Sequence, residues 1–241
     1  MNLVLLFEND FFPDSSTAKL TGRRFKHVKN VHKAEPGVSL KVGLANGKTG
    51  EGLILSMDRD SLLMDVTVNT DPPPPLPLNL VIALPRPKVL NRVIGAAASM
   101  GVKNIWLINA YKVEKSYWQS PRLSPENIIE QSILGLEQAK DTVLPTINLK
   151  NRFKPFVEDD LPQIIIGTMP IVADPSGLEP CPCEIKTPVT LTIGPEGGFI
   201  PYEIEMLKRC NFIPVHLGRR ILRVETAIPA VIYRLFSPLL L

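Results

Sequence analysis

The chain has 241 residues, 44% hydrophobic and 21% charged, which is the composition of a globular protein with a substantial core. Its formal net charge of +3 is too small to imply a partner, so binding to a polyanion would have to come from local patches.

Three cysteines, an odd number, argue against a secreted disulfide framework and favour a reducing cytoplasm. Cys181 and Cys183 have no second pair or nearby histidine to complete a ligand set, so we expect no metal site. We also expect no membrane segment, because no apolar run approaches the roughly 18 residues that a span needs.

The N-terminal part of the chain is predicted to be rich in strands. Strand-like runs at residues 38–44, 52–57 and 62–68 are separated by turn residues, among them Asn46-Gly47, a strong hairpin signal between two such runs. Residues 16–32 are expected to hold a helix or an irregular basic segment. Together these patterns predict a small β-barrel over residues 1–70.

A local basic patch lies inside this predicted barrel. Arg23, Arg24, Lys26 and Lys29 lie between Lys19 and Lys33, with no acidic residue in that stretch. Such a run is consistent with binding to nucleic acid. The alternative is that it forms an ordinary solvated face.

A proline-rich run at residues 71–77 is expected to separate two domains, because neither a helix nor a central strand can contain it. After it, residues 78–241 alternate between strand and helix patterns, which predicts a mostly parallel sheet covered on both faces. The expected strands are 78–84, 105–109, 163–167, 189–193 and 212–216. The expected helices are 89–100, 124–139, 201–210 and 225–236.

Two strand-to-helix turns stand out near the end of the chain. The first, residues 194–199, is Gly194-Pro195-Glu196-Gly197-Gly198-Phe199. The second, residues 217–223, is Leu217-Gly218-Arg219-Arg220-Ile221-Leu222-Arg223. Both follow predicted strands, so both are expected at the sheet edge where open α/β folds place their ligand crevice.

The two turns carry different chemistry. Glycines in the first let main-chain groups approach a ligand closely, and Glu196 could neutralise a cationic ligand such as a sulfonium. The alternative is a simple reversal of the chain, with Glu196 favourably placed at a helix N-terminus. Arginines in the second turn, followed by Glu225, are typical of phosphate and base recognition, although exposed arginines often serve only solubility.

The sequences at 194–199 and 217–227 together resemble the SPOUT-class methyltransferases. More narrowly, they are similar to the uracil-N3 methyltransferases of 16S (small-subunit) ribosomal RNA. The resemblance spans nearly the whole chain. The family's N-terminal basic motif is matched by His27, Val31 and Lys33 before Gly37. Its mid-domain motif is matched by Glu137-Gln138 with Pro145.

This resemblance implies an α/β fold in which a SPOUT-type trefoil-knotted domain, residues 78–241, follows a small PUA-like β-barrel that grips RNA. A knot is a known exception to the rule that chains do not thread loops. S-adenosyl-L-methionine is expected to sit bent in the knot, held by three loops. The cofactor-binding residues it implies are Ile166, Gly167, Thr168, Ile193, Gly194, Pro195, Glu196, Gly197, Gly198, Leu217, Gly218, Ile221 and Leu222.

The implied reaction is transfer of a methyl group to N3 of a uracil. We expect Arg223 to stabilise the negative charge that forms on the base and Glu225 to accept or relay the proton. The residues expected to bind RNA are Arg23, Arg24, Lys29, Lys33, Arg219 and Arg220. The expected partners are ribosomal RNA or the assembled small subunit, and a second copy of the chain, because the class places its active site at a homodimer interface.

Two alternatives stay open. One is an enzyme of the same class that acts on another RNA nucleotide, and the other is a non-catalytic RNA-binding dimer. The chain also departs from the family pattern, for example at Lys33, where arginine is usual, and at Ile200, where serine commonly caps the helix beginning at Pro201. Without that serine, Glu203 is expected to lack its capping-box partner. These departures indicate a divergent branch.

Overall fold

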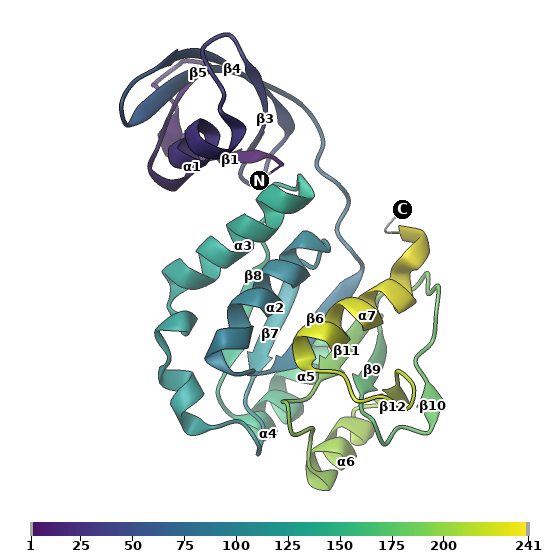
Figure 1. The fold of residues 1–241 in the computed structure, drawn as a ribbon. Coiled ribbons are helices and arrows are strands. Elements are labelled where there is room, and N and C mark those ends of the chain that lie inside the picture. Colours follow the sequence, from purple (N-terminus) through teal and green to yellow (C-terminus); the bar gives the residue numbers. More distant parts are fainter. Residues whose placement is uncertain (1, 240–241) are drawn as a thin grey trace. The chain divides into compact units, whose positions relative to one another are not determined.

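The computed structural model describes residues 2–239, and its contacts divide the chain into two compact units (Figure 1). The first unit comprises the chain up to Pro74 together with Ile133–Leu144. The second comprises Pro75–Ser132 and the residues from Pro145 onward. Residues 133–144 thus cluster with the first unit although they lie within the sequence range expected for the second domain.

The first unit is built on a sheet in the order β1-β3-β4-β5-β2, in which β1 lies parallel to β3 and the other pairs are antiparallel. Side chains alternate along β5, where Leu62, Met64 and Val66 face the core, as a half-buried strand requires. The strands are β1 (Val4–Leu6), β2 (Thr17–Thr21), β3 (Ser39–Leu44), β4 (Thr49–Met57) and β5 (Ser61–Thr70).

The connections in this unit confirm part of the sequence prediction. Asn46 has a left-handed φ of 59° and turns the chain between β3 and β4, as the Asn-Gly pair predicted. The basic segment at residues 16–32 holds a helix, which was one of the two predicted alternatives. It contains β2, then helix α1 (Gly22–His27), then a π-helical turn over Val28–His32.

The discontinuous segment 133–144 completes an apolar cluster in the first unit. Leu136 is fully buried together with Leu3 and Leu5, and Ile133 and Leu144 pack at its margin. Backbone N–H groups of Asn2 and Leu3 both donate to the carbonyl of Glu137, at 2.9 and 3.0 Å. Burial of leucines therefore holds this segment against β1.

The second unit is an open sheet of seven parallel strands in the order β10-β12-β9-β11-β6-β7-β8. All five residues of β11 are buried, as expected for a central strand covered on both faces. The strands are β6 (Leu78–Ala83), β7 (Asn104–Ile108), β8 (Thr146–Lys150), β9 (Met169–Ala173), β10 (Glu179–Pro180), β11 (Val189–Ile193) and β12 (Ile213–His216).

Helices connect these strands, and α2 and α7 pack against each other over the sheet (Figure 1). Both present an apolar stripe to the core, with Leu90 and Ile94 buried on α2 and Ile228 and Ile232 on α7. The helices are α2 (Pro87–Ser99), α3 (Pro125–Ala139), α4 (Phe153–Pro155), α5 (Leu161–Ile164), α6 (Pro201–Arg209) and α7 (Val224–Phe236).

One predicted strand is wrong. Residues 163–167 were expected to be a strand, but Leu161–Ile164 form α5, and the strand, β9, follows at Met169–Ala173. Pro162 is accommodated in the first turn of α5, where a missing N–H costs nothing. Pro170 lies inside β9, where it weakens the sequence signal for a strand.

Candidate functional site

A pocket opens at the carboxyl ends of β9, β11 and β12, three strands that are neighbours in the parallel sheet. It holds about 690 Å³ of empty space, counting the part open to solvent. Its walls are apolar side chains, glycine backbone and a few polar groups. The lining residues are Ala173, Asp174, Pro175, Ile193, Gly194, Pro195, Glu196, Gly198, Phe199, Val215, Leu217, Gly218, Arg220, Ile221, Leu222, Val224 and Ala227.

The first turn forms one wall of this pocket, and its shape requires glycine. Gly198 has a left-handed φ of 69°, and its N–H donates to the carbonyl of Pro195 at 2.7 Å. A Cβ at Gly194 would lie 3.1 Å from the backbone nitrogen and ring of Phe199, which is buried beneath the turn. The turn is therefore closed on itself and presents main-chain atoms to the pocket. Gly197 belongs to the turn but does not line the pocket.

Two side-chain contacts hold the first turn in place within the second unit. Glu196 accepts a hydrogen bond from the backbone N–H of Arg86 at 3.1 Å, where α2 begins. The Lys112 ammonium donates to the carbonyl of Gly197 at 2.6 Å. The turn is thus tied to the loops that follow β6 and β7.

As expected, Glu203 has no side-chain partner at Ile200, but its buried carboxylate accepts two backbone hydrogen bonds. It accepts the N–H of Tyr111 at 2.7 Å and the N–H of Ile200 at 3.0 Å. Glu203 therefore still caps the start of α6. Only the reciprocal bond is missing, because the aliphatic side chain of Ile200 has no acceptor.

The second turn forms the opposite wall. Gly218 has φ 108°, and its N–H donates to Nδ1 of His216 at 3.0 Å. Leu217, Gly218, Arg220, Ile221 and Leu222 all line the pocket, whereas the exposed Arg219 does not. A single cationic side chain, Arg220, is thus present in a mostly apolar lining.

The two residues expected to be catalytic flank a pocket residue. Arg223 is the N-cap of α7; its carbonyl accepts the N–H groups of Thr226 and Ala227, and its side chain is exposed. Glu225 lies in the first turn of α7 and is half-buried. Between them Val224 lines the pocket, so Arg223 and Glu225 lie next to it in sequence without forming its wall.

The structure does not bring Ile166, Gly167 and Thr168 to this pocket. They precede β9 and lie at the opposite edge of the sheet, where the Thr168 hydroxyl is 2.8 Å from that of Thr190. The error follows from the misplaced strand, because the loop after the real strand begins at Asp174. The third wall of the pocket is therefore Ala173, Asp174 and Pro175.

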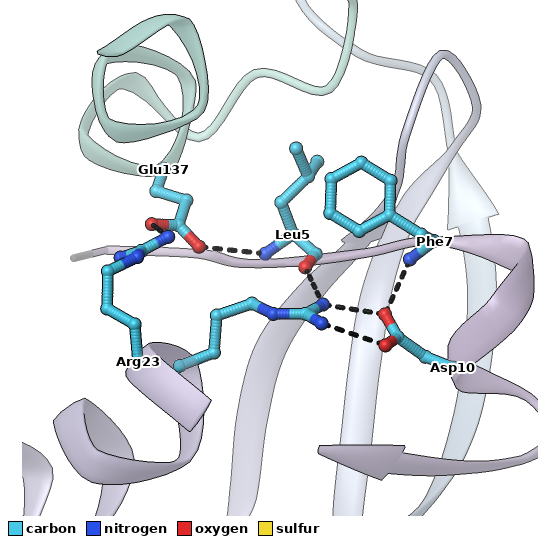
Figure 2. Close-up of polar contacts among 6 residues, drawn as sticks. Leu5, Phe7, Asp10, Arg23 and Glu137 are labelled. Carbon is cyan, nitrogen blue, oxygen red and sulfur yellow. Dashed lines mark hydrogen bonds and ion pairs between the residues drawn. The ribbon is translucent and has the colours of Figure 1, made fainter. Parts of the chain in front are cut away.

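Arg23, expected to bind RNA, forms an ion pair inside the first unit (Figure 2). Its guanidinium lies 2.9 Å from Oε2 of Glu137, a carboxylate that is only 1% exposed. The geometry is that of an ion pair without a well-directed hydrogen bond to that oxygen, while Oε1 accepts the N–H of Leu5 at 3.4 Å. Burial raises the pKa of Glu137, and the charge of Arg23 opposes that rise.

The guanidinium of Arg24, also expected to bind RNA, forms three hydrogen bonds inside the first unit. It forms two hydrogen bonds to the carboxylate of Asp10, at 2.6 and 2.8 Å, and a third to the carbonyl of Leu5 at 2.7 Å. Asp10 in turn accepts the N–H of Phe7 at 2.7 Å (Figure 2), and the guanidinium stacks over the Phe7 ring. This arrangement connects α1 to the chain after β1.

A basic groove lies beside α1 on the first unit. Four basic side chains and one acidic side chain line it, and Phe25 forms part of its base. Lys29, one of the residues expected to bind RNA, is among them, whereas Arg23, Arg24 and Lys33 are not. The charged lining residues are Lys19, Lys26, Lys29, Arg59 and Asp60. Arg59 comes from the β4–β5 turn, so sequence proximity alone did not reveal it.

Residues 2–239 also bear on metal binding, thiol reactivity and membrane insertion. They contain no group of three or more histidine, cysteine or acidic residues placed to hold a metal ion. Cys181, Cys183 and Cys210 are free thiols, and burial raises the pKa of Cys181 to about 11. In the same part of the chain, no helix has both the length and the apolar character needed to cross a membrane.

Comparison with known proteins defines the family. A family model described as an RNA methyltransferase domain matches residues 72–235, and the chain belongs to this family. The ribosomal RNA small subunit methyltransferase E of Treponema pallidum is 28% identical over 237 residues, covering 94% of this chain and 87% of that protein. The methyltransferase E 1 of Borreliella burgdorferi is 27% identical over 231 residues, covering 94% of both chains. The crystal structure of the Neisseria gonorrhoeae methyltransferase E, bound to S-adenosyl methionine, has a TM-score of 0.70 at 18% identity and covers 95% of each chain.

Proposed function

We propose that this protein uses S-adenosylmethionine to methylate N3 of a specific uridine in 16S ribosomal RNA in the cytoplasm. The observation that carries the proposal is the pocket in which the first and second turns face each other beside the N-terminus of α7. Support also comes from similarity over 94% of the chain to proteins named ribosomal RNA small subunit methyltransferase E. A trefoil knot, a PUA-like first unit and a homodimer are part of the same proposal.

The pocket residues fit the proposed cofactor. Phe199, Leu217, Leu222 and Val224 offer apolar surface to a flat base, and the glycine-rich turns offer main-chain groups at close range. Arg220 and Glu196 at the pocket supply one charge of each sign, which suits a zwitterionic amino-acid end. When bound, the cofactor supplies a methyl group already activated for transfer, so the protein contributes orientation and electrostatics.

Arg223 and Glu225 would act on the base. Removal of the N3 proton leaves a negative charge on the uracil that spreads onto the two neighbouring carbonyl oxygens. The Arg223 guanidinium, exposed at the start of α7, would stabilise that charge, and the Glu225 carboxylate would accept the proton. The base would have to leave its stack to reach them.

The experiment that tests this function is mass-spectrometric mapping of ribosomal RNA from strains with and without the gene. We expect one methylated uridine to disappear from the small-subunit RNA, together with the reverse-transcription stop that N3-methylation causes by blocking base pairing. Loss of a different modified nucleotide would favour the same enzyme class with another target. An unchanged map, with no cofactor binding by calorimetry, would favour the non-catalytic RNA-binding dimer.

We further propose that RNA phosphates bind in the basic groove beside α1. The double substitution Lys26→Ala/Arg59→Ala should weaken RNA binding and lower the slope of log K against log salt concentration by about 1.5, the loss of two phosphate contacts. Fluorescence anisotropy with a small-subunit RNA fragment between about 50 and 200 mM salt would measure both quantities.

The matched control is Lys41→Ala/Lys48→Ala, which removes the same charge from exposed positions outside the groove. Cofactor affinity should be unchanged in both double variants. Equal loss of RNA affinity in the two would show that only net charge matters, and the groove would lose its assigned role.

A further inference from the structure

Asp174 is a carboxylate inside the pocket that the reaction described above does not use. It follows β9, lies between the two turns in the order of the sheet, and is only 8% exposed. Its backbone N–H donates to the carbonyl of Val215 at 2.9 Å, which ties it to β12. Its position is therefore set by the sheet itself.

The carboxylate is oriented by one neighbouring residue. Oδ1 accepts the N–H of Ser176 at 2.8 Å and also the Ser176 hydroxyl. Within residues 2–239, Oδ2 accepts no hydrogen bond, and neither oxygen forms an ion pair. Asp174 is mostly buried, but Oδ2 is not fully shielded from solvent, so this oxygen is open to the pocket and can meet donors there. Since Asp174 lines the pocket, a ligand is the natural source of those donors.

We propose, on the basis of the function proposed above, that Asp174 binds the ribose hydroxyls of S-adenosylmethionine. The hydrated amino-acid end suits the mouth of the pocket, where Glu196, Arg220 and Ile221 are exposed. A buried carboxylate instead meets the middle of the ligand, and a vicinal diol offers two donors to its oxygens. Acidic residues at strand ends bind ribose hydroxyls in other open α/β folds.

The sulfonium is the less suitable partner for this carboxylate. Its positive charge is lost during transfer, so a close anion would stabilise the ground state more than the transition state and slow the reaction. The ribose hydroxyls do not change charge in the reaction. A hydrogen bond to them is therefore equally strong in the ground state and the transition state, and it does not slow methyl transfer. The assignment thus makes Asp174 a binding residue rather than a catalytic one.

The test combines variants with altered ligands, measured by calorimetry or competition. The ligands are S-adenosylmethionine, 5′-methylthioadenosine, which keeps the ribose but lacks the amino-acid end, and the 2′-deoxy form of methylthioadenosine. Asp174→Ala should weaken the first two alike, by about 10- to 100-fold, with Asp174→Asn intermediate. The wild-type protein should bind the 2′-deoxy analogue about tenfold more weakly than its parent, and Asp174→Ala should bind both equally.

Several outcomes would overturn the assignment. Loss of affinity for S-adenosylmethionine but not for methylthioadenosine would place Asp174 against the amino-acid end instead. Wild-type protein that binds both methylthioadenosines equally would refute the hydroxyl contact without any variant. Glu196→Gln, at the mouth of the same pocket, should keep the wild-type preference between the two analogues. If wild-type protein binds none of the ligands, the proposed function itself fails.

Discussion

Replacement of Arg223 by alanine should reduce methyl transfer by at least about 100-fold, the usual effect of removing a group that stabilises a developing oxyanion. The affinity for S-adenosylmethionine should stay close to that of the wild type, because Arg223 caps α7 with its backbone and does not line the pocket. Transfer is measured with small ribosomal subunits under single-turnover conditions, and affinity is measured by calorimetry.

Arg209, an exposed arginine near the end of α6, provides the control of equal charge. Arg209→Ala should transfer methyl groups at the wild-type rate, which separates the position of Arg223 from its contribution to net charge. Arg223→Lys should recover only part of the activity, since a point charge replaces a planar guanidinium. A wild-type rate in Arg223→Ala would remove the arginine from the mechanism.

Replacement of Arg24 by alanine should lower the free energy of unfolding by about 3 kcal/mol, the typical cost of breaking a mostly buried ion pair. The Arg24 and Asp10 side chains are only 17% and 13% exposed, so little solvent screens them. The variant would leave the Asp10 carboxylate with the N–H of Phe7 and would free the carbonyl of Leu5. Urea denaturation followed by circular dichroism would report the change.

Two further variants serve as comparisons for Arg24→Ala. Arg24→Lys should still be destabilised, since an ammonium cannot form the two parallel bonds to Asp10. Lys41→Ala, which removes a solvent-exposed ion pair with Glu51, should not shift the midpoint measurably. If Arg24→Ala instead unfolds like the wild type and loses RNA affinity, Arg24 contacts RNA, as its sequence context predicted.

The sequence predicted the second unit well where strands and turns are marked by local residues. Residues 189–193 form β11 as expected, because a run rich in β-branched residues ends at a glycine-rich turn. Residues 163–167 were predicted wrongly because three consecutive isoleucines resemble a buried strand. A helix begins at Leu161 instead, with Pro162 in its first turn. The strand that does form contains Pro170, which its sheet neighbours tolerate but which local propensity disfavours.

The position of β9 determined how much of the pocket could be predicted from the sequence. The rule that ligands meet the carboxyl ends of parallel strands was sound for β11 and β12, so both turns were found. Applied to a strand placed six residues too early, the same rule selected Ile166–Thr168 in place of Ala173, Asp174 and Pro175. The partners of Arg23 could not be foreseen either, because Glu137 is 114 positions away and no local pattern links the two.

The first unit has a consequence for synthesis of the chain. Because Leu136 and Glu137 cover Leu3 and Leu5, the N-terminal sheet lacks part of its interior until residue 144 has left the ribosome. A polypeptide cut at the proline run would leave these leucines in water and should tend to aggregate. The order of translation therefore requires the start of the second unit to emerge before the first is finished.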